Sequence, residues 1–537
     1  MWIPVLISLL LFEFARAELY TAITDLEDLL ESEAFLVRTL HSNIAAEEAK
    51  LDALRRQAKL FEEVQNEARR DISSFLLNPI NAYLLVKRMT VDWKQTEMIM
   101  EVGNVLANFT FFKEQFKFPS DEDLRGAAEA LIRLQDTYKL DTSSVARGEL
   151  NGIQYSSALS ASDCFELGRQ SYNKQDYVHT SLWMKEALKK YEQEKNQTTT
   201  QKWEILEYLA YSTYMEGNVH GALQLTDELL RLFPNHQKAL GNRAYYLAAI
   251  SKEEEEARKQ QDVASNSEST TTDTSKESKG SYSSDRAFYE ALCRKEVTLS
   301  PEYEAKLKCH YVTHNNPYLL IGPLKEEEAY LDPRIVLYRE VISDSEIEVI
   351  KKCPSQGRAT VQNYKTGALE TANYRISKSA WLKDHEDEVI ERISKRVEDM
   401  TGLTTSTAEE LQVVNYGIGG HYEPHFDFAR PSEANAFSSL GTGNRIATVL
   451  FYMSDVAEGG GTVFPRLNLA LWPKKGTAAV WMNLHASCNG DYRTRHAACP
   501  VLIGSKWVCN KWLHVVGQEF RRPCVPNEFQ SVDQDYN

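Results

Sequence analysis

The sequence lacks an excess of basic residues: 61 Lys and Arg stand against 77 Asp and Glu, a net charge of −16 at pH 7. Binding to a phosphate backbone depends on positive charge, so nucleic acid is not expected as a partner. Long apolar runs are also missing, and a spanning helix needs roughly 20 apolar residues, so no membrane span is expected. At 537 residues and 42% hydrophobic composition, the chain has room for two or three domains.

Cysteine is scarce as well, with eight residues in the whole chain, too few for a disulfide scaffold. No two of them stand two to four residues apart, which argues against a zinc knuckle. Four of them, Cys488, Cys499, Cys509 and Cys524, fall in one short stretch. Oxidised pairs are expected there.

The first residues resemble an export signal. Trp2–Phe14 is an apolar run that is too short to span a membrane, and Ala15-Arg16-Ala17 supplies a small-x-small cleavage pattern. We expect residues 1–17 to be removed, with a retained anchor as the alternative, and the mature protein to be lumenal or secreted. The sequons at Asn108 and Asn196 agree with glycosylation in that compartment.

Residues 18–144 are expected to be helical. Between 26 and 61 apolar side chains recur at heptad spacing, which predicts a helix with a seam. The seam residues are Val37, Leu40, Ile44, Leu51, Leu54, Ala58 and Phe61. The seam either packs within the helix's own bundle or pairs two chains in a coiled coil that makes a dimer.

Residues 145–250 contain two related helical hairpins at tetratricopeptide offsets, 42 rather than 34 residues apart. The segment is rich in tyrosine, at positions 172, 177, 208, 211, 214, 245 and 246. Several of these tyrosines must be ordinary core. Exposed ones would form a groove for polyproline II peptides, whose rings stack on aromatic faces.

Residues 251–286 begin with Glu253–Glu256 and continue as a Ser/Thr/Glu/Lys tract, which predicts a flexible linker. Beyond it, 287–537 shows the period of two typical of strands, with one clear helix near Glu386–Asp399. The expected strands are Ile335–Tyr338, Arg358–Val361, Leu411–Tyr416, Ile446–Tyr452, Ala478–Met482 and Lys506–Leu513. This pattern indicates a β-sandwich or barrel, so the fold class is multidomain, α then β.

A His425-x-Asp427 pair lies in the run 415–428, on a further segment that we expect to be a strand, where alternation would turn both side chains to one face. Such a pair is weak alone, because chance supplies it often. His496, at the start of another predicted strand, can complete a two-histidine, one-carboxylate triad that suits Fe(II). Lys506 lies in an otherwise apolar strand, and a buried lysine needs an anion such as a dicarboxylate cosubstrate.

Several blocks resemble the α subunits of collagen prolyl 4-hydroxylases, and the resemblance extends over essentially the whole chain. They are His421-Tyr-Glu-Pro-His-Phe-Asp-Phe428, Leu440-Gly-Thr-Gly-Asn-Arg-Ile-Ala-Thr448, Arg495-His-Ala-Ala-Cys-Pro500, Gln518-Glu-Phe-Arg-Arg-Pro-Cys524 and Asp163-Cys-Phe-Glu-Leu-Gly168. The resemblance implies a C-terminal double-stranded β-helix (jelly-roll) dioxygenase. It implies hydroxylation at proline C4 in X-Pro-Gly triplets of procollagen, with Fe(II), 2-oxoglutarate and ascorbate as cofactors.

By this resemblance, His425, Asp427 and His496 are the iron ligands, and Lys506 binds 2-oxoglutarate with help from Tyr416 and Thr462. Arg445 and Trp512 line the peptide side of the pocket. The proline-peptide groove falls on Tyr172, Tyr208, Tyr211, Asn242 and Tyr245. Lys238 departs from the arginine expected at its position, so peptide preference can differ.

The resemblance also implies disulfides Cys293–Cys309 and Cys499–Cys524. Cys488 and Cys509 have no counterpart in the family pattern, and we expect them to form an extra bridge. The implied partner is protein disulfide isomerase, the β subunit of an α2β2 assembly in the endoplasmic reticulum lumen. Because the chain ends in Asp533–Asn537 without a retention tetrapeptide, retention would come through that partner.

Three other functions are less well supported. A lumenal hydroxylase acting on lysine or on proline C3 lacks support from the motif blocks. A noncatalytic scaffold for proline-rich peptides would be favoured by loss of a metal ligand, and none is lost. A cytosolic oxygen-sensing hydroxylase conflicts with the export signal.

Overall fold

The computed structural model describes residues 23–100, 120–194, 200–264, 285–352, 357–358, 360–362, 369–371, 374–433, 436–438 and 440–525. The expected signal peptide and both sequons lie outside these ranges. Contacts divide the chain into two units, Met1–Ile72 with Arg88–Phe118 and Ser73–Lys87 with Pro119–Asn537. None of the helices described combines the length and apolar character needed to cross a membrane.

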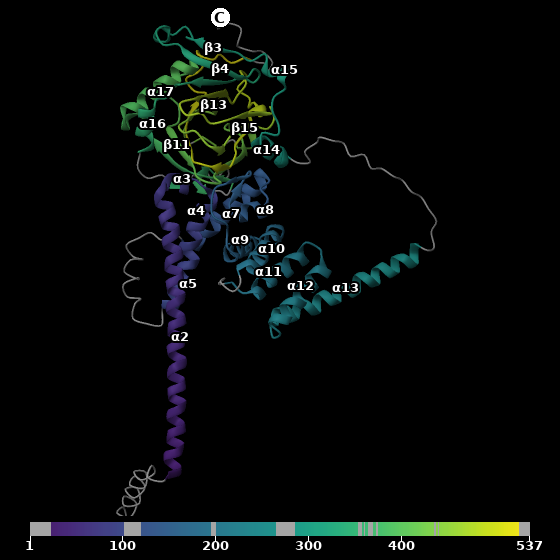
Figure 1. Cartoon of the computed structure of the whole chain (residues 1–537). Coiled ribbons are helices and arrows are strands. Elements are labelled where there is room, and N and C mark those ends of the chain that lie inside the picture. The colour runs from purple at the N-terminus through teal and green to yellow at the C-terminus, as the bar shows by residue number, and fades with distance from the viewer. Residues whose placement is uncertain are drawn as a thin grey trace, which may run out of the picture. The chain divides into compact units, whose positions relative to one another are not determined.

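The first unit contains the predicted heptad helix, α2 (Ile23–Arg70) (Figure 1). It also contains a π-helical turn, η1 (Arg88–Asp92), and α5 (Trp93–Met100), where Trp93 packs on Phe61 with ring centroids 4.8 Å apart. The seam residues Val37, Leu40 and Ile44 are all about half exposed, as is Leu51. Pairing of two chains along this seam stays a prediction.

The sequence analysis treated 18–144 as one helical region, but the second unit takes up its later part. The helices that precede the tyrosine-rich segment are α3 (Ile72–Leu76), α4 (Pro79–Lys87), α7 (Asp121–Tyr138) and α8 (Thr142–Ala146). Helix α7 reaches the β domain, where Arg133 donates a 2.9 Å hydrogen bond to the carbonyl of Gly419 and Tyr138 donates one to the carbonyl of Pro500. These bonds explain why α7 belongs with the second unit.

The tyrosine-rich segment forms successive helices, each packed on the next (Figure 1). After the short hairpin β1 (Glu149–Leu150) and β2 (Ile153–Gln154) come α9 (Ala161–Asn173), α10 (Tyr177–Glu194), α11 (Lys202–Met215), α12 (Val219–Leu232) and α13 (Gln237–Ala264). Gly168 explains the close packing of the first hairpin, because an added Cβ would lie 2.8 Å from the Met184 methyl. Helix α13 continues to Ala264, so the first part of the predicted linker 251–286 is helical. The run Glu253–Glu256 sits on this helix, and glutamate is a good helix former.

Within the described residues, the C-terminal strands form a nine-stranded and a five-stranded antiparallel sheet. The nine-stranded sheet has the order β3 (Cys309–Val312), β4 (Leu324–Tyr330), β5 (Ile335–Arg339), β17 (Ala478–Met482), β13 (Arg445–Tyr452), β20 (Lys506–His514), β11 (Leu411–Tyr416), β10 (Lys378–Leu382) and β6 (Gly357–Arg358). The five-stranded sheet has the order β16 (Leu469–Leu471), β15 (Thr462–Phe464), β18 (His496–Ala498), β12 (His421–His425) and β9 (Arg375–Ile376). Two small ribbons pair β14 (Glu458–Gly459) with β19 (Val501–Ile503) and β7 (Thr360–Gln362) with β8 (Leu369–Thr371).

Alternation along the strands builds a core on each face of the larger sheet. On β13, Val449 and Phe451 pack with α16 (Asp344–Lys351) and α17 (Glu388–Thr401). Leu450 and Tyr452 point the other way, into a core shared with β15, β16 and β18 of the smaller sheet. The two facing sheets confirm the double-stranded β-helix.

The disulfide in the structure differs from the predicted pairs. Cys293, at the end of α14 (Asp285–Cys293), bonds to Cys499, just after β18. Both cysteines are buried in a core that α14 makes with β15 and β18, whereas Cys309 and Cys524 are exposed. The predicted pairs Cys293–Cys309 and Cys499–Cys524 are therefore wrong in this structure.

The expected bridge between Cys488 and Cys509 is also absent. Cys509 is buried in the core between the larger sheet and its helices, and its thiol is free. The sulfur of Cys488 lies instead 3.3 Å from that of Cys524.

Candidate metal centre

His425, Asp427 and His496 come together as predicted, with one ligand atom from each inside a 4.8 Å cluster. The His425 Nε2 lies 3.7 Å from Asp427 Oδ1, and His496 Nε2 lies 3.6 Å from Asp427 Oδ2. The two histidines face each other across the β12–β18 ladder. Asp427 is not on a strand, because β12 ends at His425. The turn after β12, rather than strand alternation, therefore brings the carboxylate to the histidines.

Both imidazoles have the orientation that a metal ligand needs. The Nδ1 of His425 donates to the carbonyl of Glu423 at 2.8 Å, and Nδ1 of His496 donates to the carbonyl of Thr494 at 3.0 Å. A carbonyl only accepts, so each Nδ1 carries the proton and each Nε2 keeps its lone pair. The two Nε2 atoms are thus free to bind a cation.

Burial sets the charge of the cluster. It lowers the pKa of His425 to about 3, with the neighbouring His496 adding to the effect, so the ring is neutral near pH 7. Burial acts to raise the pKa of Asp427, but His496 and His425 outweigh it and lower the pKa to about 2. Two imidazole Nε2 lone pairs and one carboxylate are a donor set that fits Fe(II) and leaves coordination positions open.

Two residues that the sequence analysis missed support Asp427. The Thr448 hydroxyl donates a 2.7 Å hydrogen bond to Asp427 Oδ2 and accepts one of 2.9 Å from Asn483 Nδ2. Both residues are buried. Thr448 sits in an apolar strand and Asn483 follows another, and no local pattern distinguished either from ordinary core.

Lys506 is buried at the start of β20, as expected, with 1% of its surface exposed. Its ammonium donates to the Thr462 hydroxyl at 3.3 Å and lies 5.5 Å from the centre of the Tyr416 ring. Within the described residues no carboxylate forms an ion pair with it, and burial lowers its pKa to about 7. Such a site favours an added anion.

Thr462 connects Lys506 to the metal cluster. It is paired with Ala498 on β18, two residues from His496, so Thr462 and His496 share one face of the smaller sheet. Two residues along a strand span roughly 7 Å. The Thr462 hydroxyl also accepts a 2.9 Å hydrogen bond from Tyr452, a residue that sequence reasoning missed. Its own proton is therefore available to a bound anion.

Arg445 and Trp512 lie together, with the guanidinium carbon 3.8 Å from the centre of an indole ring. Arg445 is not a free cation, because its Nε and Nη2 both donate to the carboxylate of Glu409. His514 Nε2 lies 2.9 Å from the same carboxylate. Although burial acts to raise the pKa of Glu409, Arg445 and His514 lower it to about 2. Sequence reasoning missed Glu409 and His514.

The predicted groove tyrosines cluster on α9, α11 and α13. Tyr172 contacts Tyr208 and Tyr211 edge-to-face, with ring centroids 4.9 and 5.7 Å apart. Tyr245 is 59% exposed, and Asn242 lies one helical turn before it. Tyr246, in contrast, is 1% exposed, and is one of the tyrosines that serve as core.

The position that departs from the family pattern is exposed. The ammonium of Lys238 lies 3.5 Å from the carboxylate of Glu207 on α11. Lys238 therefore remains accessible to a bound peptide.

Three family models match successive parts of the chain. Residues 22–152 match the family described as the prolyl 4-hydroxylase alpha-subunit, N-terminal region, 161–252 match the prolyl 4-hydroxylase peptide-substrate-binding domain, and 411–514 match the 2OG-Fe(II) oxygenase superfamily. A crystal structure of viral collagen prolyl hydroxylase from Paramecium bursaria Chlorella virus-1, in complex with 2OG, is 26% identical and covers 34% of this chain and 96% of its own, with a TM-score of 0.27.

Curated relatives match over nearly the full length. Prolyl 4-hydroxylase subunit alpha-1 of Mus musculus is 47% identical over 540 residues, covering 98% of this chain and 100% of the relative. Subunit alpha-2 of Caenorhabditis elegans is 49% identical over 528 residues, covering 97% and 96%. The chain therefore belongs to the family of prolyl 4-hydroxylase alpha subunits.

Proposed function

We propose that this chain is the catalytic α subunit of a prolyl 4-hydroxylase that hydroxylates C4 of proline in X-Pro-Gly triplets of procollagen. The reaction consumes O2 and 2-oxoglutarate and gives succinate and CO2. One observation carries the proposal: a complete triad of two histidines and a carboxylate lies in the same β domain as a buried lysine that has no carboxylate partner in the described chain.

His425, Asp427 and His496 would hold Fe(II), which supplies the oxidative chemistry when bound. The histidines present lone pairs because their Nδ1 protons are held by backbone carbonyls. Asp427 supplies the negative charge, and its hydrogen bond from Thr448 fixes the plane of the carboxylate. The protein's contribution is thus positioning rather than acid–base catalysis.

Lys506, Thr462 and Tyr416 would bind 2-oxoglutarate at the end remote from the metal. Lys506 offers a cation and Thr462 a hydroxyl proton to the distal carboxylate. Tyr416 stands opposite Lys506 on the neighbouring strand and closes that side of the pocket. Because all three side chains are buried, the ion pair forms where it is little screened by water.

Two surfaces would recognise the peptide. Near the metal, the guanidinium of Arg445 lies over the ring of Trp512, and this pair would pack against a proline ring, because Glu409 already neutralises the guanidinium. In the helical segment 145–250, the groove residues Tyr172, Tyr208, Tyr211, Asn242 and Tyr245 would hold proline-rich segments by ring stacking. The groove would raise the local concentration of substrate at the catalytic domain.

The proposal extends to the assembly. Protein disulfide isomerase is proposed as the β subunit, in an α2β2 assembly in the endoplasmic reticulum lumen, with ascorbate as the reductant that would keep a bound iron ferrous. The half-exposed apolar residues of α2, among them Leu40 and Leu51, support pairing of two α chains. An export signal at 1–17 would bring the chain into the endoplasmic reticulum, and a retained partner would keep it there.

The test is an assay of the full chain, coexpressed and purified with protein disulfide isomerase. With a (Pro-Pro-Gly) repeat peptide, we expect peptide-dependent decarboxylation of 2-oxoglutarate and an equal amount of 4-hydroxyproline. Formation of 3-hydroxyproline or hydroxylysine instead would assign a different hydroxylase. Peptide binding without decarboxylation, in a protein loaded with Fe(II), would support the noncatalytic scaffold.

A further inference from the structure

Cys488 and Cys524 are neighbours that the family pattern does not explain. Their sulfur atoms lie 3.3 Å apart, although the residues are 36 positions apart in sequence. Cys488 belongs to the loop between β17 and β18, and Cys524 to the segment that follows β20. A disulfide bond is about 2.05 Å long, so a shift of about 1 Å would allow the two sulfurs to bond.

Other contacts hold these two segments together independently of the sulfurs. The backbone N–H of Val525 donates to the carbonyl of Ala486 at 3.2 Å, and the guanidinium of Arg522 donates to the carbonyl of Leu484 at 3.1 Å. The loop itself is tight, because the N–H of Cys488 donates to the carbonyl of His485 at 2.9 Å. Hydrogen bonds between the two segments therefore bring the thiols close together, whether or not the sulfurs are bonded.

The two thiols are also accessible to an oxidant. Cys524 is exposed and Cys488 is partly exposed, whereas the free thiols of Cys164 and Cys509 are fully buried. Cys499, the other possible partner of Cys524, is already bonded to Cys293. Cys309 is a further exposed thiol, so it is the sulfur–sulfur distance of 3.3 Å that makes Cys488 the thiol placed to react with Cys524.

We propose that Cys488 and Cys524 form a second disulfide in the mature protein. The two thiols lose two protons and two electrons, and a disulfide oxidant of the glutathione or protein-disulfide class is reduced to its dithiol. Exchange proceeds through a mixed disulfide on the more exposed Cys524, which the Cys488 sulfur then displaces. The inference does not depend on the proposed hydroxylase activity.

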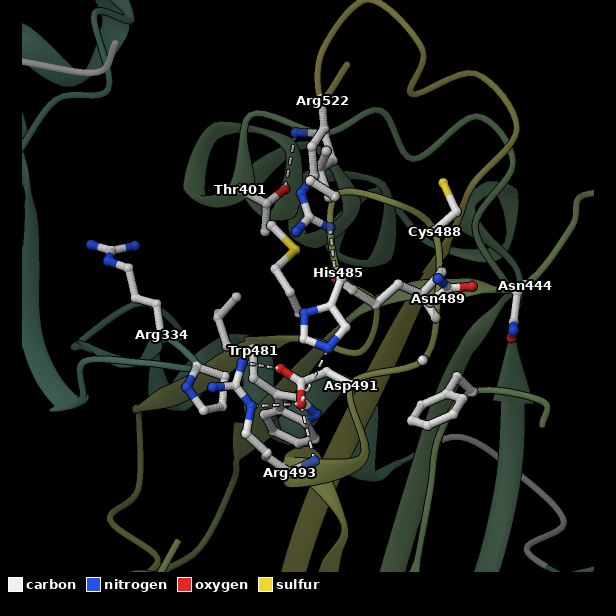
Figure 2. Close-up of a pocket in the computed structure, with 18 of the residues that line it drawn as sticks. Arg334, Thr401, Asn444, Trp481, His485, Cys488, Asn489, Asp491, Arg493 and Arg522 are labelled. Atoms are coloured by element: carbon white, nitrogen blue, oxygen red, sulfur yellow. Dashed lines mark hydrogen bonds and ion pairs between the residues drawn. The ribbon is translucent and has the colours of Figure 1, made fainter. Parts of the chain in front are cut away.

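One of the two bonded residues, Cys488, lines a large pocket. Cys488 and Arg522 both line a cavity of about 1880 Å³ (Figure 2). The loop that carries Cys488 continues through Asp491, whose N–H donates to the carbonyl of Asn483 at 2.9 Å, and on to His496. The bridge would therefore restrain residues 483–496. This segment runs from Asn483, which supports Asp427 through Thr448, to the metal ligand His496.

Peptide mapping of the full chain can test the pairing. After thiol alkylation without reduction, trypsin separates the cysteines: residues 476–493 carry Cys488, 522–537 carry Cys524 and 496–506 carry Cys499. We expect peptide 476–493 linked to 522–537, and 287–294, with Cys293, linked to 496–506. A link between 496–506 and 522–537, or alkylated Cys488 and Cys524 in a chain made in an oxidising compartment, would overturn the proposal.

Variants provide a second measurement. Cys488→Ser, Cys524→Ser and the double variant should all lower the Tm by the same few degrees, because each removes the same bond. Cys524→Ser should also leave Cys488 open to alkylation. In Cys509→Ser, the matched control, the link between 476–493 and 522–537 should persist. Additive losses of Tm in the double variant would show that the two residues contribute separately and are not bonded.

Discussion

The hydroxyl of Thr448 donates a 2.7 Å hydrogen bond to Oδ2 of Asp427 while it accepts one of 2.9 Å from Asn483. The amide of Asn483 donates to the hydroxyl oxygen of Thr448 and so occupies one of its lone pairs. The hydroxyl proton of Thr448 is therefore directed at the carboxylate of Asp427. The carboxylate is thereby held with its oxygens 3.7 and 3.6 Å from the two histidine Nε2 atoms. Thr448 is thus a positioning residue for the triad.

Thr448→Val should weaken metal binding, because valine keeps the shape of threonine and loses the hydrogen bond. We expect the dissociation constant for Fe(II) or Co(II) to rise about 10-fold or more, the usual size of such effects. Thr448→Ser should restore most of the affinity. Titration of the metal-free protein gives the constants, and Thr407→Val, at a partly exposed site, is the control. An unchanged constant in Thr448→Val would remove Thr448 from the metal site.

Replacing a metal ligand should have a larger effect. His496→Ala should abolish peptide-dependent decarboxylation of 2-oxoglutarate without preventing assembly with the partner, since the ring serves the metal rather than a subunit interface. His385→Ala, which removes an exposed imidazole from the same domain, should retain full activity. The assay measures CO2 release by the purified complex, and substantial release by His496→Ala would contradict the triad assignment.

Binding of 2-oxoglutarate should weaken as the pH rises. Burial lowers the pKa of Lys506 to about 7, so above pH 7 the free enzyme holds this amine mostly neutral. The distal carboxylate of 2-oxoglutarate favours the charged form of Lys506, so binding takes up a proton. Above pH 7 the affinity for 2-oxoglutarate should therefore fall, approaching about 10-fold per pH unit. Calorimetry between pH 6.5 and 8.5 on the Mn(II)-loaded enzyme measures the slope.

Two variants of Lys506 separate charge from shape. Lys506→Arg should bind more weakly but without this slope, because a guanidinium stays charged throughout the range. Lys506→Ala should lose most of its affinity at every pH. The assignment of Lys506 would fail if the alanine variant bound 2-oxoglutarate as tightly as the unmodified protein.

The groove can be tested separately from the chemistry. Tyr245 is exposed, and its hydroxyl contacts that of Tyr214 at 3.1 Å, so Tyr245→Ala should leave the fold intact. Loss of one stacking ring, worth about 1 kcal/mol, should raise the KM for long (Pro-Pro-Gly) peptides several-fold at constant kcat. Short peptides that cannot span both sites should be unaffected. Tyr318→Ala, an exposed tyrosine of the catalytic domain, is the control. Equal effects on long and short peptides would argue against a separate groove.

Long periodic segments of this fold could be predicted from the sequence, whereas short ones could not. The heptads before residue 61 and the apolar run Ile446–Tyr452 correspond to α2 and β13. Strands such as β15 and β18, three residues each, are too short for a period to show. They exist because neighbouring strands pair with them.

The same contrast holds for the site. His425, Asp427 and His496 could be found because the His-x-Asp pair and a second histidine make a metal-binding donor set, and Lys506 because a lysine is unusual in an apolar strand. The Thr448–Asn483 pair could not, since its role depends on two strands lying side by side. The cysteine pairs also depend on which surfaces pack together, as α14 on β18 brings Cys293 to Cys499.

The position of His425 opposite His496 has a mechanical consequence. A cation held by both would act as a crosslink between β12 and β18, two strands whose pairing is already irregular at this point. Amide hydrogens of these strands should therefore exchange with solvent more slowly in the metal-loaded protein. Because β18 also pairs with the strand of Thr462, iron would stiffen the wall against which the cosubstrate binds. Loading of the metal would thus prepare the pocket for the molecule that binds next.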